Sequence, residues 1–171
     1  MMADLERFRT AQAARHAGYV DAIGELRAGH KTSHWIWYIF PQLGGLGHSS
    51  MAVRYALAGA HEAADYLRDP VLGQRLCAAA RAVRGHVAPQ RGRGASLEAV
   101  MGSDIDALKL VSSMTLFADV GARMIAAGDA RAELADLVAD AEAILRAAGE
   151  QGYERCAHTA RALSDPGRSA R

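Results

Sequence analysis

The chain has 171 residues, half of them hydrophobic and under a quarter charged, and a formal net charge of +1. The low charge argues against the strongly basic surface of a nucleic-acid-binding protein and against electrostatic attraction to a membrane, so we expect neither partner. No apolar run approaches the ~20 residues of a membrane-spanning helix, and the charged N-terminus is unlike a secretory signal. We therefore expect a soluble, cytoplasmic protein.

Alanine is abundant and runs of β-branched residues are rare, which favours helices. The prediction is a mainly α fold, a compact multi-helix bundle with little or no sheet. Its length suits one domain over residues 1–165, followed by a disordered tail at 166–171. Cys77 and Cys156 lie far apart and form no CxxC pair, so both are predicted to be reduced thiols.

In chain order, apolar residues first recur at helical spacing over residues 4–27, which predicts one helix ended by Gly29. Residues 34–40 are ambiguous between a short helix and a buried extended run, because the following Pro41 disfavours helix at its neighbour.

A glycine-rich turn at 44–47 precedes Ser49 and Ser50, either of which can cap a short helix. This turn has the chemistry of an anion site, but the signal is weak and a plain loop-to-helix connection is the favoured interpretation. The segment 85–95 is the longest predicted loop. Further helices are predicted at about 61–67, 70–84, 97–101, 104–120, 130–148 and 153–163.

Residues 31–42 are the most informative segment, because four of the ten aromatic residues lie between positions 35 and 40. Trp35 and Trp37 follow His34 and precede Gln42. Large rings beside a few polar groups are typical of a small-molecule pocket, and equally of a protein core. His34 is either a hydrogen-bonding or basic group toward a ligand or a structural residue.

A second group of polar residues shares one stripe of the predicted helix at 104–120: Asp106, Lys109, Ser112 and Ser113. An ammonium beside hydroxyls suits a phosphate or a carboxylate, whereas the alternative is a solvated helix face. Lys31 and Lys109 are the only lysines of the chain. The seven histidines form no ligand motif, so neither a metal nor a cofactor is expected.

Two long strings carry a resemblance to a known family: His-Trp-x-Trp-x-x-Phe-Pro-Gln at 34–42 and Lys-Leu-x-Ser-Ser-Met-Thr-Leu-Phe at 109–117. The chain resembles the bacterial family called domain of unknown function 1810 (DUF1810), with further matching stretches at 5–12, 25–29, 45–49 and 66–76. The resemblance spans residues 5–117 and implies a mainly α-helical domain. It implies no established activity.

Three functions stay open at this point. The first is a pocket for a small anionic or nucleotide-like ligand, and the second is a non-catalytic interaction or oligomerisation module. The third is an enzyme acting on ADP-ribose or NAD-related adducts, which rests on a remote likeness to another helical bacterial family and assigns no residue roles. We expect the segments 31–42 and 106–116 to meet. The candidate ligand-binding residues are Lys31, His34, Trp35, Trp37, Gln42, Asp106, Lys109, Ser112 and Ser113.

Overall fold

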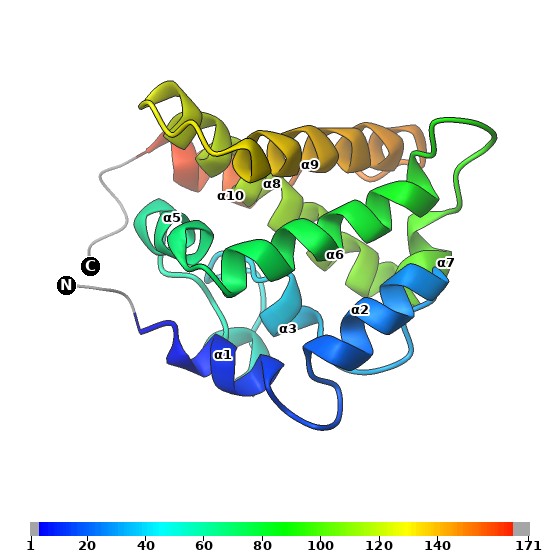
Figure 1. Ribbon diagram of the computed structural model, residues 1–171, viewed down its shortest axis with the longest axis horizontal. Coiled ribbons are helices and arrows are strands. Elements are labelled where there is room, and N and C mark those ends of the chain that lie inside the picture. Colours follow the sequence, from blue (N-terminus) through cyan, green and yellow to red (C-terminus); the bar gives the residue numbers. More distant parts are fainter. Residues whose placement is uncertain (1–3, 166–171) are drawn as a thin grey trace.

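Figure 1 shows the computed structural model, which describes residues 4–165. This part of the chain forms helices and no sheet, and a single isolated parallel bridge joins Leu43 to Leu57. The prediction of a mainly α fold is therefore confirmed. The helices are α1 Glu6–Gln12, α2 Tyr19–Ala28, α3 Ile36–Ile39, α4 Ser50–Arg54, α5 Ala60–Arg68, α6 Leu72–Val87, α7 Leu97–Met101, α8 Asp104–Ala126, α9 Ala132–Glu150 and α10 Ala157–Ser164.

The longest helix, α8, lies inside the fold. It packs along α9 and also contacts α3, α5, α7 and α10, so residues 110–118 are all buried. The helix α6 packs against α9, α2 and α5 and crosses the front of the view in Figure 1. Leu72, Leu76, Ala79 and Val83 form its buried face, as the sequence pattern predicts.

The prediction of one helix over residues 4–27 is wrong, because the chain breaks between α1 and α2. Ala17 adopts a left-handed conformation with φ of 53°, and its N–H donates to Asp21 Oδ2 at 2.8 Å. A Cβ on Gly18 would lie 2.1 Å from the carbonyl oxygen of Ala14. The apolar periodicity continues across this turn, which explains why the sequence pattern predicted a single helix.

Serine caps are predicted correctly. The hydroxyls of Ser49, Ser96 and Ser103 each accept a backbone N–H at 3.1 Å, at the starts of α4, α7 and α8. Gly102 ends α7 with φ of 80°. Glycine is a weaker signal of a helix end in the longer helices, because α6 continues two residues past Gly85 and α9 includes Gly149.

Helix lengths near the C-terminus differ from the predictions. The helix α8 runs six residues beyond 120, and α10 begins four residues later than 153. Both cysteines are free thiols, as expected. The predicted tail at 166–171 lies outside the described residues.

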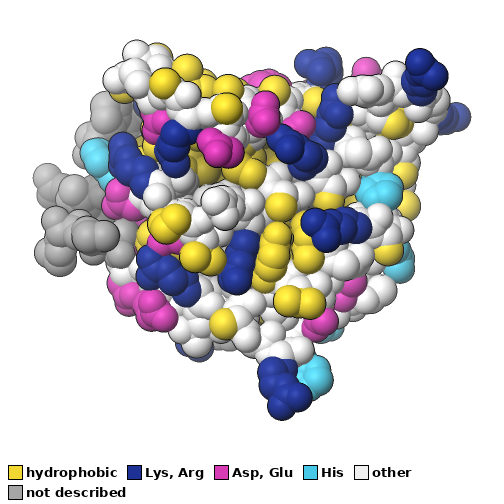
Figure 2. All heavy atoms as spheres, viewed as in Figure 1, with side chains coloured by type: hydrophobic (Ala, Val, Ile, Leu, Met, Phe, Trp, Pro, Cys, Tyr) yellow, Lys and Arg dark blue, Asp and Glu magenta, His cyan; other side chains and the backbone are white. Residues whose placement is uncertain are grey.

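The surface carries both signs of charge. Figure 2 shows Lys and Arg side chains interspersed with Asp and Glu on the face that includes α6 and α9. Within residues 4–165, no helix is both long and apolar enough to cross a membrane.

Candidate functional site

Glu25 of α2 holds the segment that leads into the aromatic cluster. Its carboxylate accepts the N–H groups of Thr32 at 2.8 Å and Ser33 at 3.0 Å, the hydroxyl of Ser33, and the indole N–H of Trp35 at 2.8 Å. Burial would raise the pKa of Glu25, but these hydrogen bonds outweigh it and lower the pKa to about 2. The segment is therefore fixed by one ionised carboxylate.

Lys31 reaches α8 because its backbone docks on the corner between α7 and α8. Its N–H donates to the carbonyl oxygen of Val100 at 2.8 Å. A Cβ on Gly102 would lie 2.7 Å from the carbonyl oxygen of Lys31, so this close approach requires glycine. The Lys31 side chain is thereby directed at the first turn of α8.

Asp106 is shared by the two lysines of the chain. Its Oδ2 lies 2.7 Å from Lys31 Nζ, and its Oδ1 lies 3.1 Å from Lys109 Nζ. Burial would raise the pKa of Asp106, but hydrogen bonds and charge attraction from both lysines lower it below its usual value. Two ammonium groups around one carboxylate leave this group of three residues with an excess of one positive charge.

Each lysine also lies over a tryptophan ring. Lys31 Nζ is 5.0 Å from the ring centroid of Trp35, and Lys109 Nζ is 4.6 Å from that of Trp37. Both distances are within the range of a cation–π interaction. Trp35 is fully buried, whereas Trp37 is partly exposed, so only the second pair faces solvent.

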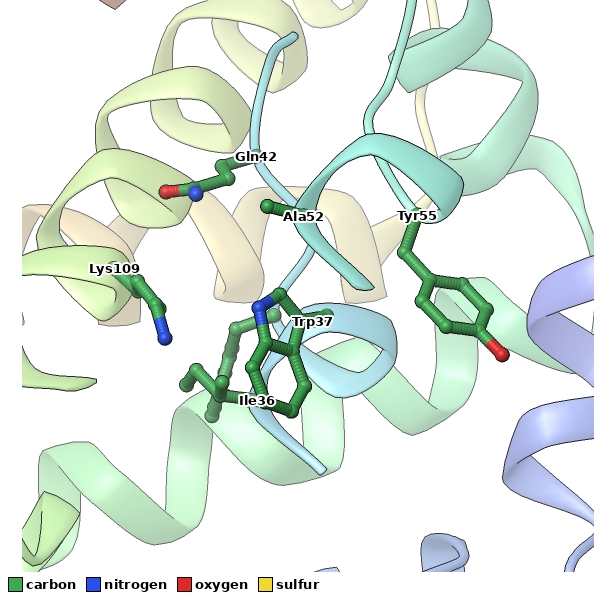
Figure 3. A pocket seen from close by; sticks show the side chains of 7 residues that line it. Ile36, Trp37, Gln42, Ala52, Tyr55 and Lys109 are labelled. Carbon is green, nitrogen blue, oxygen red and sulfur yellow. The ribbon is translucent and has the colours of Figure 1, made fainter. Parts of the chain in front are cut away.

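A small hollow of about 10 Å³ opens beside the Lys109–Trp37 pair, close to the space that one water molecule requires. At the Leu43–Leu57 bridge, Gly44 N–H donates to the Leu57 carbonyl oxygen and Leu57 N–H donates to the Gln42 carbonyl oxygen, both at 3.0 Å. Neighbouring side chains of an extended segment point to opposite sides, so Gln42 enters the hollow and Leu43 points away from it. Figure 3 shows the Gln42 amide extending toward the helix that carries Lys109, with the Tyr55 hydroxyl turned away. The hollow is lined by Ile36, Trp37, Phe40, Gln42, Ala52, Tyr55 and Lys109.

The structure thus brings the two predicted segments together through Lys31, Trp37, Gln42, Asp106 and Lys109. The other four candidates, His34, Trp35, Ser112 and Ser113, are placed elsewhere.

His34 is exposed and does not line the hollow. Trp35 belongs to the core, where its only polar group is bound to Glu25.

The expectation that α8 presents both serine hydroxyls beside the ammonium is wrong. Neither Ser112 nor Ser113 lines the hollow. Ser112 donates to the carbonyl oxygen of Leu108 at 3.1 Å, within its own helix. Ser113 is fully buried, and its hydroxyl has no hydrogen-bond partner among residues 4–165. The reason is that other helices surround α8 beyond its second turn.

Residues 2–133 match the family described as "Protein of unknown function (DUF1810)". The chain belongs to the DUF1810 family. The resemblance noted from residues 5–117 is therefore confirmed and extends further along the chain. No match was found among curated proteins.

One solved structure is similar to this DUF1810 protein: the crystal structure of the conserved hypothetical protein Rv1873 from Mycobacterium tuberculosis. The two sequences are 38% identical over 95% of this chain and 97% of that chain, with a TM-score of 0.73. This coverage means that the shared fold continues past residue 133, where the family match ends.

Three contributors to this site were missed from the sequence. Glu25 carries no motif of its own, since its partners lie seven to ten residues ahead across a turn. Ala52 lines the hollow from α4, and Tyr55 lines it from the C-cap of that helix. The predicted cap at Ser49 indicated that a helix starts there, but not that this helix packs beside the hollow. Among residues 4–165, no group of three or more His, Cys, Asp or Glu side chains is placed to hold a metal ion.

Proposed function

We propose that this DUF1810 protein binds a small anionic group, a carboxylate or a phosphate, at the ammonium of Lys109 between Trp37 and Gln42. The observation that carries the proposal is the sharing of one carboxylate, Asp106, between two lysines. The surplus positive charge lies partly desolvated beside an aromatic ring, where an anion is attracted more strongly than in water.

The donors of the site support this assignment. An ammonium group has three N–H donors, and Asp106 accepts one from Lys109. The face of Trp37 attracts the charge without accepting a strong hydrogen bond. Gln42 lines the same hollow and adds amide N–H donors. An anion placed here would receive charge-assisted hydrogen bonds from Lys109 and neutral ones from Gln42.

The size of the site favours a compact anionic group over a whole nucleotide. The hollow has room for only about one water molecule, so the anionic group would meet Lys109 at its opening, and Lys109 already covers one face of Trp37. A nucleobase would have to displace that ammonium to stack on this face. We propose binding rather than catalysis, because the Asp106 carboxylate is engaged by both lysines and the Tyr55 hydroxyl is turned away, so neither is placed to act as a general base.

Calorimetric titration with inorganic phosphate and with acetate, at constant ionic strength, tests the proposal. Lys109→Met keeps the apolar stem and removes the charge, so it should weaken binding about five- to 150-fold, which corresponds to about 1–3 kcal/mol. Arg93→Ala is the matched control, because it removes one positive charge from an exposed loop residue. Its affinity should equal that of the wild type.

Two outcomes would contradict the proposal. One is the absence of binding by either anion at millimolar concentration. The other is an equal loss of affinity in Lys109→Met and Arg93→Ala, which would indicate a general charge effect. Circular dichroism of Lys109→Met should show an unchanged helical spectrum, since the proposed role of Lys109 is in binding and not in packing.

A further inference from the structure

Exposed aliphatic residues flank Lys109 in the sequence of α8 and Ala52 in the sequence of α4. Residues 4–165 contain six large hydrophobic residues with exposed side chains, and three of them adjoin this site in sequence. Ile105 is 66% exposed and Leu108 is 49% exposed, on α8 next to Asp106 and Lys109. Val53, 65% exposed, follows Ala52 of the hollow on α4. Isolated exposed aliphatics need no explanation, but a group beside a charged site does.

The geometry of α8 places Ile105 beside the ammonium. Side chains of a helix lean toward its N-terminus, so the Lys109 stem passes over the residues three and four positions earlier. The bond from Lys109 to Asp106 shows this direction, and Ile105 is the residue at the fourth position. Leu108 is three residues from Ile105 and therefore its neighbour on the helix surface. A cation and an apolar pair thus form one continuous surface.

From this surface we infer the class of ligand, an inference that rests on the proposed function: the anion is the C-terminal carboxylate of another polypeptide whose last residue is aliphatic. The carboxylate meets Lys109 and Gln42, and the last side chain covers Ile105 and Leu108. The charge of the partner is complementary to the surplus positive charge around Asp106.

A polypeptide end fits this surface better than a small free acid. The aliphatic residues lie on open surface, whereas the enclosed part of the site holds only about one water molecule. A free acid would leave most of its own apolar surface in water. A chain end brings a backbone that can continue across α4 or α8 and cover several exposed side chains at once.

Fluorescence anisotropy with three labelled hexapeptides tests the inference. One peptide ends in Gly-Leu with a free carboxylate, the second is its C-terminal amide, and the third ends in Gly-Ser with a free carboxylate. The amide should bind at least tenfold more weakly, because it lacks the charge that Lys109 receives. The Ser-ended peptide should bind about tenfold more weakly, because burying a Leu side chain accounts for a factor of this order.

The double variant Ile105→Gln, Leu108→Gln separates the two parts of the site. It should abolish the preference for Leu over Ser and leave the affinity for acetate within twofold of wild type. Val20→Gln is the control, since Val20 is an exposed aliphatic on α2. N-acetyl-leucine should bind more weakly than the Leu-ended peptide if a polypeptide end is the ligand.

The outcomes distinguish this inference from the proposed function. If phosphate and acetate bind through Lys109 but the Leu-ended peptide binds no better than its amide or the Ser-ended peptide, the inference is wrong and the anion site stands. An N-acetyl-leucine affinity equal to that of the peptide would also overturn the choice of a polypeptide end. If no anion binds, both are wrong.

Discussion

Lys31 Nζ lies 2.7 Å from Asp106 Oδ2, and these two side chains expose only 6% and 15% of their surface. This ion pair joins the aromatic segment to the first turn of α8. Breaking a buried ion pair by removing one partner is costly, because the remaining charge stays desolvated.

Asp106→Asn should therefore lower the free energy of unfolding by about 2–4 kcal/mol, since it leaves two lysines without their carboxylate. Lys31→Met should cost less, because Asp106 keeps Lys109. Urea denaturation of both single variants and the double variant gives the coupling energy between them. A coupling near zero would show that the pair does not stabilise the fold.

The lowered pKa of Glu25 predicts a loss of stability in acid. Its pKa is about 2 in the folded protein and 4.5 for an unperturbed carboxyl group, so between these values the unfolded chain binds the extra proton. The stabilisation is complete above pH 4.5 and is lost as the pH falls toward 2. Asp106 contributes in the same direction, because its pKa is also lowered.

Glu25→Gln should lower the unfolding free energy by about 2 kcal/mol at neutral pH and reduce the decline between pH 4.5 and 2. The measurement is chemical denaturation at several pH values, followed by Trp fluorescence. A variant with the same acid dependence as the wild type would mean that other carboxylates determine it.

Substitution by alanine should have opposite effects on stability at two glycines, one in the turn between α1 and α2 and one inside α2. Gly18→Ala should destabilise the protein by about 2 kcal/mol or more, because its Cβ would collide with the Ala14 carbonyl oxygen at 2.1 Å. Gly24→Ala in α2 meets no atom within 4 Å and should stabilise the protein by about 0.5–1 kcal/mol. Melting temperatures of the two variants should move in opposite directions.

Removing each of two buried hydroxyls of α8 should change the free energy of unfolding in opposite directions. Ser113→Ala should raise the unfolding free energy by about 1 kcal/mol and leave anion affinity unchanged, because its hydroxyl is buried without a partner. Thr115→Val should lower it by about 1 kcal/mol, because Thr115 Oγ1 accepts the N–H of Cys156 at 3.2 Å. Weaker anion binding in Ser113→Ala would show that the Ser113 hydroxyl contributes to the anion site.

Local signals in the sequence determined the starts of α4, α7 and α8. Ser49, Ser96 and Ser103 cap helices because their hydroxyls bond a backbone N–H three residues away, an interaction that needs no distant partner. The spacing of apolar residues three and four positions apart along α6 likewise determined its buried face. The break at Gly18 was not readable, because it depends on a clash with the Ala14 carbonyl that exists only once the turn has formed.

The residue types of the site could be listed from the sequence, but their roles depended on the packing around α8. Trp37 and Trp35 are two positions apart in one aromatic string, yet one faces the hollow and the other is covered on all sides. Ser113 and Lys109 share a helical stripe, but neighbouring helices bury the serine and leave the lysine at the edge. Sequence spacing determines which residues share a face of a helix, whereas exposure of that face depends on contacts between segments far apart in the chain.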